Sequence, residues 1–261
     1  MHVLESFSLK GKVALVTGGA GLYGRQIVEA LAEAGAKTFL AARSVDKLEA
    51  VAAEERARGH DVTALHLDLS SDVSIEALHK TIIEQAGRCD VLVNNAVTRS
   101  ALSGWKHELD DFDASLRVNA SALFKITELF GTTMRANRYG SIINIGSMMG
   151  MVGLELGNYV GTDMMPNPSP IYHYEKGGMI SFTRWAASVL GVDGVRVNCL
   201  SPGGFFNNQP APFVKNYSDR TQLGRMANST DMKGAIIFLA SDASLYITGT
   251  NLPVDGGYTA K

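Results

Sequence analysis

The hydrophobic positions along the chain follow two alternating periods. Short apolar runs with few charges inside recur along the whole chain, and each is too short for a helix, as expected for strands covered on both faces. These runs occupy residues 13–16, 38–41, 62–67, 91–93, 142–145, 195–200 and 251–254. Longer stretches with apolar residues at helical spacing lie between them, at residues 26–34, 47–58, 74–85, 110–135, 177–190 and 230–240.

This alternation of strand-like and helical stretches predicts an α/β fold. Repeated βαβ units with right-handed crossovers build a doubly wound, mostly parallel seven-stranded sheet with helices on both faces. No repeat or low-complexity linker divides the 261 residues, so we expect residues 1–261 to form one domain. A ligand of such a sheet binds outside the carboxyl ends of the strands.

Two irregular stretches break the alternation. Residues 150–170 are rich in glycine and proline and cannot be one regular helix or strand. Residues 202–216 are a second stretch of this kind. Because long loops in compact domains are commonly functional, we expect both to form walls of a binding pocket, the first as an inserted substrate loop.

Charge and composition exclude several classes of function. The chain has 24 basic and 26 acidic residues, mixed throughout. This pattern indicates neither a basic surface for binding nucleic acid nor a polybasic patch for binding a membrane. The N-terminus lacks the pattern of a signal peptide and no apolar run is long enough to span a membrane, so we expect a cytoplasmic protein. Neither the two cysteines nor the six histidines have the spacing of metal ligands, so no metal site is expected.

A glycine-rich turn follows the first strand-like run. Gly19, Gly21 and Gly24 fit the G-x-G-x-x-G fingerprint of dinucleotide-binding, Rossmann-type folds, and an amphipathic helix comes next. Glycines there let backbone N–H groups approach a pyrophosphate, at which the helix also points its positive end. An NTP-hydrolysing phosphate loop is rejected because Arg25 and Gln26 stand where Lys and Ser or Thr would be needed. The expected cofactor contacts of this turn are Gly18, Gly19, Gly21, Leu22, Tyr23 and Gly24.

The end of the second strand bears on the choice of cofactor. NAD-binding turns usually place Asp or Glu there, to accept a hydrogen bond from the ribose 2′-hydroxyl. This chain has Ala42 followed by Arg43. A guanidinium suits a 2′-phosphate, although it can also stack on adenine without selecting between the dinucleotides. The sequence therefore favours NADP over NAD.

Further motifs follow in an ordered series. They are the opening segment 9–18, Asp68-Leu69, Asn94-Asn95-Ala96, Val118-Asn119, Asn144-Ile145-Gly146-Ser147, Tyr172-x-x-x-Lys176, Ser201-Pro202-Gly203 and Val254-Asp255-Gly256-Gly257. In this series the chain resembles the short-chain dehydrogenase/reductase family, in its smaller single-domain branch, over almost its whole length. The series as a whole is far more specific than any one of its motifs.

The resemblance implies a set of site residues. Its catalytic residues are Asn119, Ser147, Tyr172 and Lys176, and Lys176 also holds the nicotinamide ribose while Asn119 anchors a water leading to that lysine. Further cofactor contacts implied by it are Asp68, Leu69, Asn95, Ala96, Tyr172, Pro202, Gly203, Gly204 and Phe205.

The spacing of the residues agrees with these roles. Tyr172 and Lys176 are four positions apart and share one face of a helix, where a lysine cation favours the phenolate needed by a general acid/base. Ser147 can hydrogen-bond the substrate oxygen as charge develops on it.

Three departures from the family pattern stand out. The middle glycine of the first turn is Gly21, where smaller members of the family use the place of Leu22. Ser147 and Tyr172 are 172 − 147 = 25 positions apart, about double the family's spacing, and the extra residues fall in the irregular stretch 150–170. Asn207 replaces the threonine usual after the Pro-Gly turn.

These features predict an NAD(P)-dependent oxidoreductase that interconverts a secondary alcohol and a ketone. The resemblance extends to a subgroup linked to sugar and surface-glycan precursors, so we expect a small-molecule substrate that is a sugar, sugar acid or polyol, bound by Ser147, Tyr159, Tyr172 and Asn208. A 3-oxoacyl thioester reductase is the competing enzyme, and a catalytically idle NAD(P)-binding sensor or scaffold is the alternative of another class. Members of the family are commonly dimers or tetramers, so the resemblance implies a homo-oligomer, such as a homotetramer, built on the helices 110–135 and 177–190.

Overall fold

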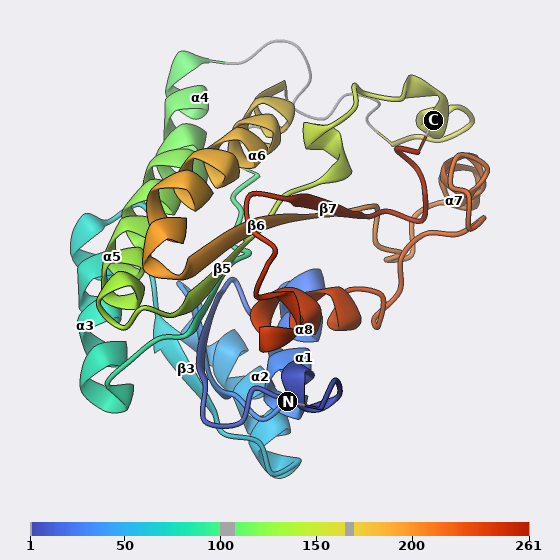
Figure 1. Ribbon diagram of the computed structural model, residues 1–261. Coiled ribbons are helices and arrows are strands. Elements are labelled where there is room, and N and C mark those ends of the chain that lie inside the picture. Colours follow the sequence, from blue (N-terminus) through green and yellow to red (C-terminus); the bar gives the residue numbers. More distant parts are fainter. Residues whose placement is uncertain (1, 100–107, 165–169, 261) are drawn as a thin grey trace.

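In the computed structural model, which describes residues 2–99, 108–164 and 170–260, a seven-stranded sheet forms the centre of the molecule (Figure 1). The strand order is β3-β2-β1-β4-β5-β6-β7, and every neighbouring pair is parallel. The strands are β1 Val13–Thr17, β2 Lys37–Ala42, β3 Val62–His66, β4 Val91–Asn94, β5 Gly140–Ile145, β6 Val195–Pro202 and β7 Asn251–Val254. The predicted doubly wound sheet is confirmed, with each strand at or within a few residues of its predicted position.

Helices cover both faces of the sheet (Figure 1). They are α1 Leu22–Glu33, α2 Val45–Ala57, α3 Asp72–Ala86, α4 Leu109–Leu116, α5 Ala122–Ala136, α6 Pro170–Leu190, α7 Ala211–Ser218 and α8 Lys233–Ala240. Alternate residues of β1 enter two separate cores: Ala14 and Val16 pack with α1, α2 and α8, whereas Val13 and Leu15 pack with α3, α5 and α6. Because successive side chains of a strand point to opposite faces of the sheet, one hydrophobic core lies on each face.

Several predicted boundaries differ from the structure. The helix expected at 177–190 already begins at Pro170, because a proline is well tolerated in the first turn of a helix. The helix expected at 110–135 is α4 and α5, joined by a π-helical turn, Arg117–Ser121. The helix expected at 230–240 begins at Lys233. The irregular stretch 202–216 ends in α7, in which Pro212 is accommodated in the first turn.

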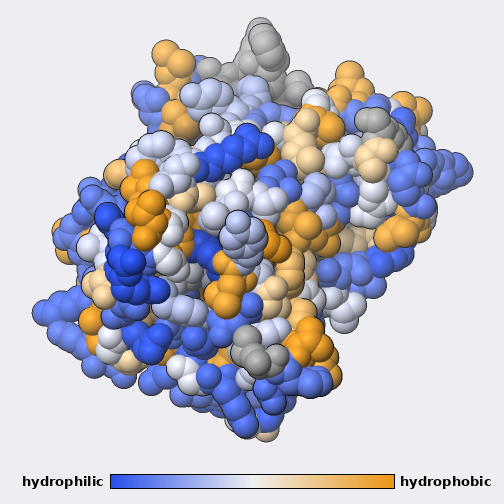
Figure 2. Space-filling model, in the orientation of Figure 1, coloured by the Kyte–Doolittle hydropathy of each residue, from blue (hydrophilic) through white to orange (hydrophobic). Residues whose placement is uncertain are grey.

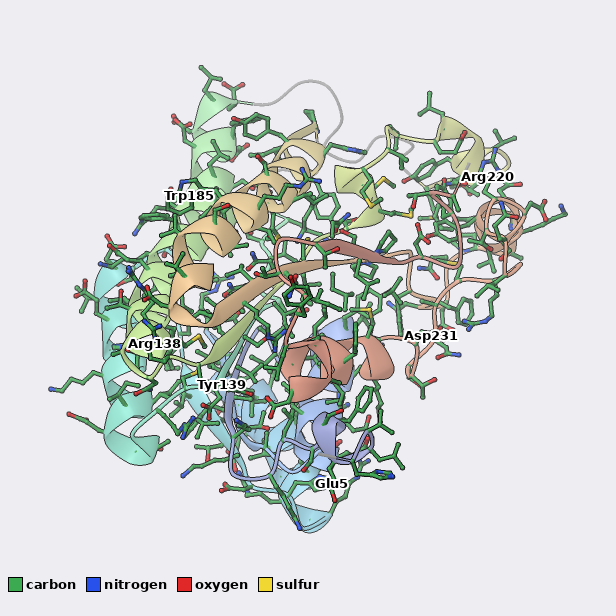
Figure 3. The ribbon with its side chains drawn as sticks, viewed as in Figure 1. Glu5, Arg138, Tyr139, Trp185, Arg220 and Asp231 are labelled. Atoms are coloured by element: carbon green, nitrogen blue, oxygen red, sulfur yellow. The ribbon has the colours of Figure 1, made fainter. Side chains whose placement is uncertain are left out.

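The first part of the inserted loop has two 3₁₀ turns, η3 Met148–Gly150 and η4 Leu156–Tyr159. It packs against α7, where Asn216 Nδ2 donates to Val160 O at 2.8 Å. Arg220, labelled in Figure 3, lies just after α7 and pairs with Glu155 of the loop at 3.6 Å. Residues 165–169 of this predicted loop, including Pro166 and Pro168, lie outside the described residues.

Hydrophilic and hydrophobic groups are interspersed on the face of the molecule shown in Figure 2. Among the described residues, no helix combines the length and the apolar character needed to cross a membrane.

Candidate active site

A cavity of about 900 Å³ lies at the carboxyl ends of the strands. The loops that follow β1 to β6 contribute to its walls, as expected for a doubly wound sheet. Eighteen of the predicted site residues line it: Gly18, Gly21, Leu22, Tyr23, Gly24, Arg43, Asp68, Leu69, Asn95, Ala96, Ser147, Tyr159, Tyr172, Lys176, Pro202, Gly203, Gly204 and Phe205. Gly19, Asn119 and Asn208 are not part of this lining.

The glycine-rich turn after β1 forms part of the cavity wall. A Cβ atom on Gly24 would lie 2.2 Å from Gly18 O, so only glycine allows α1 to start this close to the turn. Gly19 packs against Leu40 and Val28 instead of facing the cavity, which explains its absence from the lining. No side chain caps the N-terminus of α1 at Gly21, so its backbone N–H groups are available to a phosphate.

Asn95 supports this turn from the next strand of the sheet. Its Nδ2 donates to Thr17 O and to Gly18 O, each at 3.0 Å, while the backbone N–H of Ala96 donates to Thr17 Oγ1. The Asn95 side chain therefore fixes the turn at which a pyrophosphate would bind.

Tyr23 joins the two loops that flank the cavity. Its hydroxyl donates to Gly203 O at 2.8 Å, and its ring meets Phe205 edge to face, with ring centroids 5.4 Å apart. Burial raises the pKa of the Tyr23 phenol, so the hydroxyl keeps its proton and remains a donor. The Pro-Gly turn after β6 is thereby attached to the first turn after β1.

Two cations line the cavity near the end of β2, the strand next to the one that carries the glycine-rich turn. Arg43 lines the cavity as predicted, and Lys47 in the first turn of α2 lines it as well. The Asp68 carboxylate after β3 accepts from Ser70 N at 2.9 Å and Ser70 Oγ at 2.7 Å, and these bonds lower the pKa of Asp68. The part of the cavity next to α2 is thus polar, and Arg43 and Lys47 give it positive charge.

The predicted catalytic residues Ser147, Tyr172 and Lys176 line the same cavity, the serine after β5 and the other two on α6. Lys176 Nζ lies 5.7 Å from the Tyr172 ring centroid and donates to Ile145 O at 2.7 Å. Burial lowers the pKa of the Lys176 ammonium, an effect that the neighbouring Tyr172 opposes. Ser147 Oγ accepts from Met149 N at 3.1 Å, which leaves its O–H proton free to be donated to a ligand.

Close backbone packing holds the serine turn against the tyrosine helix. A Cβ atom on Gly150 would lie 2.6 Å from the backbone carbonyl of Lys176, so the turn that carries Ser147 touches α6 directly. His173 adds a second link, with its Nδ1 2.9 Å from Met149 O. The long insertion therefore leaves the serine and the tyrosine together, although 25 positions separate them.

Asn119 takes part in a buried network beneath the cavity. Its side-chain amide forms hydrogen bonds with both backbone groups of Thr98: Thr98 N donates to Asn119 Oδ1 at 2.9 Å, and Asn119 Nδ2 donates to Thr98 O at 3.0 Å. Asn119 Nδ2 also donates to Glu175 Oε2 at 2.9 Å, and Ser115 Oγ donates to Glu175 Oε1 at 2.8 Å. Burial raises the pKa of Glu175, against these two hydrogen bonds, which lower it.

The remaining wall combines the inserted loop and α7. Tyr159 stacks edge to face on Phe213, with ring centroids 5.4 Å apart. Tyr217 Oη accepts from Gly204 N and lies 3.2 Å from the Met148 sulfur. This apolar cluster closes the cavity on the side of the predicted substrate loop.

The structure places one predicted substrate residue away from the cavity. Asn208 is exposed, and its φ of 56° belongs to a turn that leaves Asn207 and Gln209 in the lining instead. Gln209 itself is held by a 2.8 Å bond from its Nε2 to Phe205 O.

Four ionisable lining residues were not among the sequence predictions. They are Lys47, Arg99, Glu175 and Tyr217. Lys47 follows the predicted arginine by one helical turn, and Glu175 lies inside the Tyr-x-x-x-Lys motif, so a closer inspection of the sequence would have found both. Arg99 and Tyr217 carry no such signal, because only the fold brings them to the cavity.

Among the described residues, no group of three or more His, Cys, Asp or Glu side chains has the arrangement of a metal site. Cys89 and Cys199 are both buried and free.

Comparison with known proteins gives a consistent family assignment. Residues 21–259 match a family model described as enoyl-(acyl carrier protein) reductase. A 3-oxoacyl-(acyl-carrier-protein) reductase of Staphylococcus aureus is 34% identical over 253 residues, which cover 94% of this chain and 97% of the relative.

Solved structures show the same fold. A short-chain type dehydrogenase/reductase from Mycobacterium marinum is similar over 100% of both chains, with 29% identity and a TM-score of 0.88. A gluconate 5-dehydrogenase from Burkholderia cenocepacia, in complex with NADP and tartrate, matches with the same identity, coverage and TM-score.

Proposed function

Since this chain belongs to the short-chain dehydrogenase/reductase family and is an NAD(P)-dependent oxidoreductase of that family, we propose that it interconverts a secondary alcohol and a ketone. The single observation that carries the proposal is the meeting of Tyr172, Lys176 and Ser147 in one cavity. The dinucleotide supplies the hydride when bound, and the chain supplies position and a proton. We further propose that all of these parts belong to one domain.

Tyr172 acts as the general acid/base in this proposal. The Lys176 ammonium, held by Ile145 O, favours the phenolate that accepts the alcohol proton, and the phenol returns it to the ketone oxygen in the reverse direction. Ser147 donates its hydroxyl proton to the same substrate oxygen while charge develops there. Removing the acid/base by Tyr172→Phe is expected to lower kcat by about 10²- to 10⁴-fold.

The residues of the cavity fit a dinucleotide. The close approach at Gly24, the uncapped N-terminus of α1 and the size of the cavity suit a pyrophosphate with two nucleosides. The two cations Arg43 and Lys47 support a preference for NADP(H), because both can meet a 2′-phosphate. We expect Arg43→Ala to raise the Kd of NADPH by about 10- to 100-fold and to change that of NADH little. An unchanged preference for NADPH in this variant would refute the role of Arg43.

The substrate is proposed to be a sugar, a sugar acid or a polyol. Thr98, Asn207 and Gln209 contribute polar groups to the lining of the cavity, as a polyhydroxylated ligand requires. The similarity to a gluconate 5-dehydrogenase supports the same class. A reductase of 3-oxoacyl thioesters is the second candidate, favoured by the 34% identical relative with that name.

A substrate panel separates the two candidates. Sugars, aldonic acids and polyols are offered with NADP⁺, and acetoacetyl thioesters and ketoses with NADPH, at equal concentrations. Fast turnover of the thioesters with no response to any carbohydrate would establish the second candidate and reject the first. The intact set of catalytic residues argues against a catalytically idle sensor, which would turn over none of these compounds.

We propose that the protein forms a homo-oligomer, a dimer or a tetramer, through α5 and α6. Phe124 on α5 and Phe182 and Trp185 on α6 form a cluster of aromatic rings, and Phe124 and Trp185 are about half exposed. Trp185 is labelled on α6 in Figure 3. Exposed apolar clusters of this kind mark association surfaces. Light scattering on Trp185→Glu is expected to show dissociation, with Tyr246→Glu, at a fully exposed position, as the control.

We also propose a cytoplasmic location, because an enzyme that exchanges hydride with NADP(H) needs a compartment that holds the free dinucleotide. Cell fractionation with the tagged protein tests this location.

A further inference from the structure

Arg99 places a second cation beside the catalytic tyrosine. Its guanidinium carbon lies 5.3 Å from the Tyr172 ring centroid, while Lys176 Nζ lies 5.7 Å from the same centroid. The two cations differ in their surroundings: Lys176 is buried and bonded to Ile145 O, whereas Arg99 is exposed and lines the cavity. The Arg99 guanidinium is therefore accessible to a bound ligand.

Arg99 makes no ion pair with any residue of the described part of the chain. Residues 100–107 and 165–169, which are not described, contain no aspartate or glutamate in the sequence. Of the described lining residues, Asp68 and Glu175 are the acidic ones, and both are already bonded, to Ser70 and to Ser115 with Asn119. The positive charge next to Tyr172 is thus left uncompensated by the protein.

The backbone next to Arg99 is fixed. Thr98 is held at both its N–H and its carbonyl by Asn119, which Glu175 holds in turn. A guanidinium anchored in this way loses less freedom when it binds a ligand, and its planar fork matches a carboxylate through two parallel hydrogen bonds.

We propose that Arg99 binds a carboxylate of the substrate itself, so that the enzyme acts on a hydroxy acid and its keto acid, such as an aldonic acid. This inference rests on the proposed function and narrows its substrate class. Because Arg99 lies beside the general acid/base, the anion must be only a few bonds from the carbon that is oxidised. The phosphate of a pantetheine carrier lies at the far end of its arm from the reacting ketone, which does not match this position.

The test compares pairs of ligands that share a carbon skeleton and differ in the acid group. Calorimetric titration of the NADPH complex with D-gluconate against D-glucitol, and with L-tartrate against L-threitol, measures binding without turnover, because an alcohol cannot accept hydride from NADPH. We expect at least one acid to bind about 10- to 100-fold more tightly than its neutral partner, as one charge-assisted interaction provides. Arg99→Met should abolish this difference. Arg138→Met, which removes a guanidinium paired with Asp193, should preserve it.

Each other outcome overturns the inference. The carboxylate role of Arg99 is rejected if acid and neutral partners bind equally, or if neither member of either pair binds. It is also rejected if the preference for the acid survives in Arg99→Met. Tighter binding of 4′-phosphopantetheine than of any acid, lost in Arg99→Met, assigns Arg99 to a phosphate and also rejects the proposal. Failure of the proposed function is a separate observation, namely turnover of an identified substrate that Tyr172→Phe leaves unchanged.

Discussion

Asn119 donates a 2.9 Å hydrogen bond to the carboxylate of Glu175, one residue before Lys176. Ser115 donates to the second oxygen of that carboxylate, so a buried acid stands behind the active site with both oxygens engaged. Burial favours the protonated form of the Glu175 carboxyl over the ionised form and so raises its pKa. The two hydrogen bonds lower this pKa and offset only part of the effect of burial.

Glu175→Gln is expected to change how stability depends on pH. Burial raises the pKa of Glu175 in the folded state above its ordinary value of 4.5, so its contribution to stability is complete below that value and declines as pH rises through the folded-state pKa. Glutamine cannot ionise, so the free energy of unfolding of the variant relative to wild type should rise as pH increases from 4.5 upward. Urea denaturation at a series of pH values measures it.

The matched control is Glu84→Gln, at an exposed position beside Lys80. Its stability relative to wild type should stay nearly flat over the same range. A flat profile for Glu175→Gln as well would contradict the role assigned to burial.

Tyr23→Phe removes the hydrogen bond between the two loops that flank the cavity. Gly203 O then loses its donor, which costs about 1–3 kcal/mol where the group stays buried. We expect a lower melting temperature and a Kd for NADPH raised by about tenfold, because the Pro-Gly turn is no longer attached to the first turn. Fluorescence titration measures this affinity. Tyr246→Phe, at a fully exposed position, should alter neither quantity.

Gly24→Ala and Gly178→Ala should act in opposite directions. At Gly24 the new methyl would lie 2.2 Å from Gly18 O, so the turn must move, at a cost of about 1–3 kcal/mol and most of the cofactor affinity. At Gly178, in α6, nothing lies within 4 Å of the added Cβ, and alanine should stabilise the helix by about 0.5–1 kcal/mol. Thermal unfolding with and without NADP⁺ compares the two variants. If NADP⁺ raises the melting temperature of both variants equally, Gly24 is not required for binding the cofactor.

Gly150→Ala tests the contact between the serine turn and α6. The added methyl would lie 2.6 Å from the Lys176 carbonyl and must push Ser147 away from Tyr172. Misplacement of a reacting group by about 1 Å can lower the rate by about 10²-fold, so kcat should fall with little change in cofactor affinity. Gly153→Ala, with nothing within 4 Å of its Cβ, should leave kcat near that of wild type. Steady-state kinetics on an identified substrate measures both.

The hydrophobic pattern was sufficient to predict the sheet, because buried parallel strands and amphipathic helices leave clear periodic signals. The first turn and the Tyr-x-x-x-Lys motif are local in sequence, so their residues could be placed from the sequence as well. The apolar spacing predicted this helix only from residue 177, so the start of α6 at Pro170 was missed, although Tyr172 and Lys176 were expected on one helical face.

Long-range contacts account for the rest. Arg99 reaches Tyr172 only because β4 lies beside β5 in the sheet and Asn119 fixes Thr98. Asn208 was expected in the pocket because amide groups suit a polyhydroxylated substrate, but its local turn leaves Asn207 and Gln209 in the lining instead. No pattern of residue types specifies which of three adjacent amides faces a cavity.

The link between the inserted loop and α7 bears on how this enzyme can be redesigned. Asn216 donates a hydrogen bond to Val160 O, and Arg220 pairs with Glu155, so two segments about sixty residues apart in sequence form a single wall. A chimera that imports either segment alone from a relative would lose these bonds and leave their partners exposed. Substrate preference is therefore best transferred by exchanging the inserted loop and the α7 segment together, as one unit.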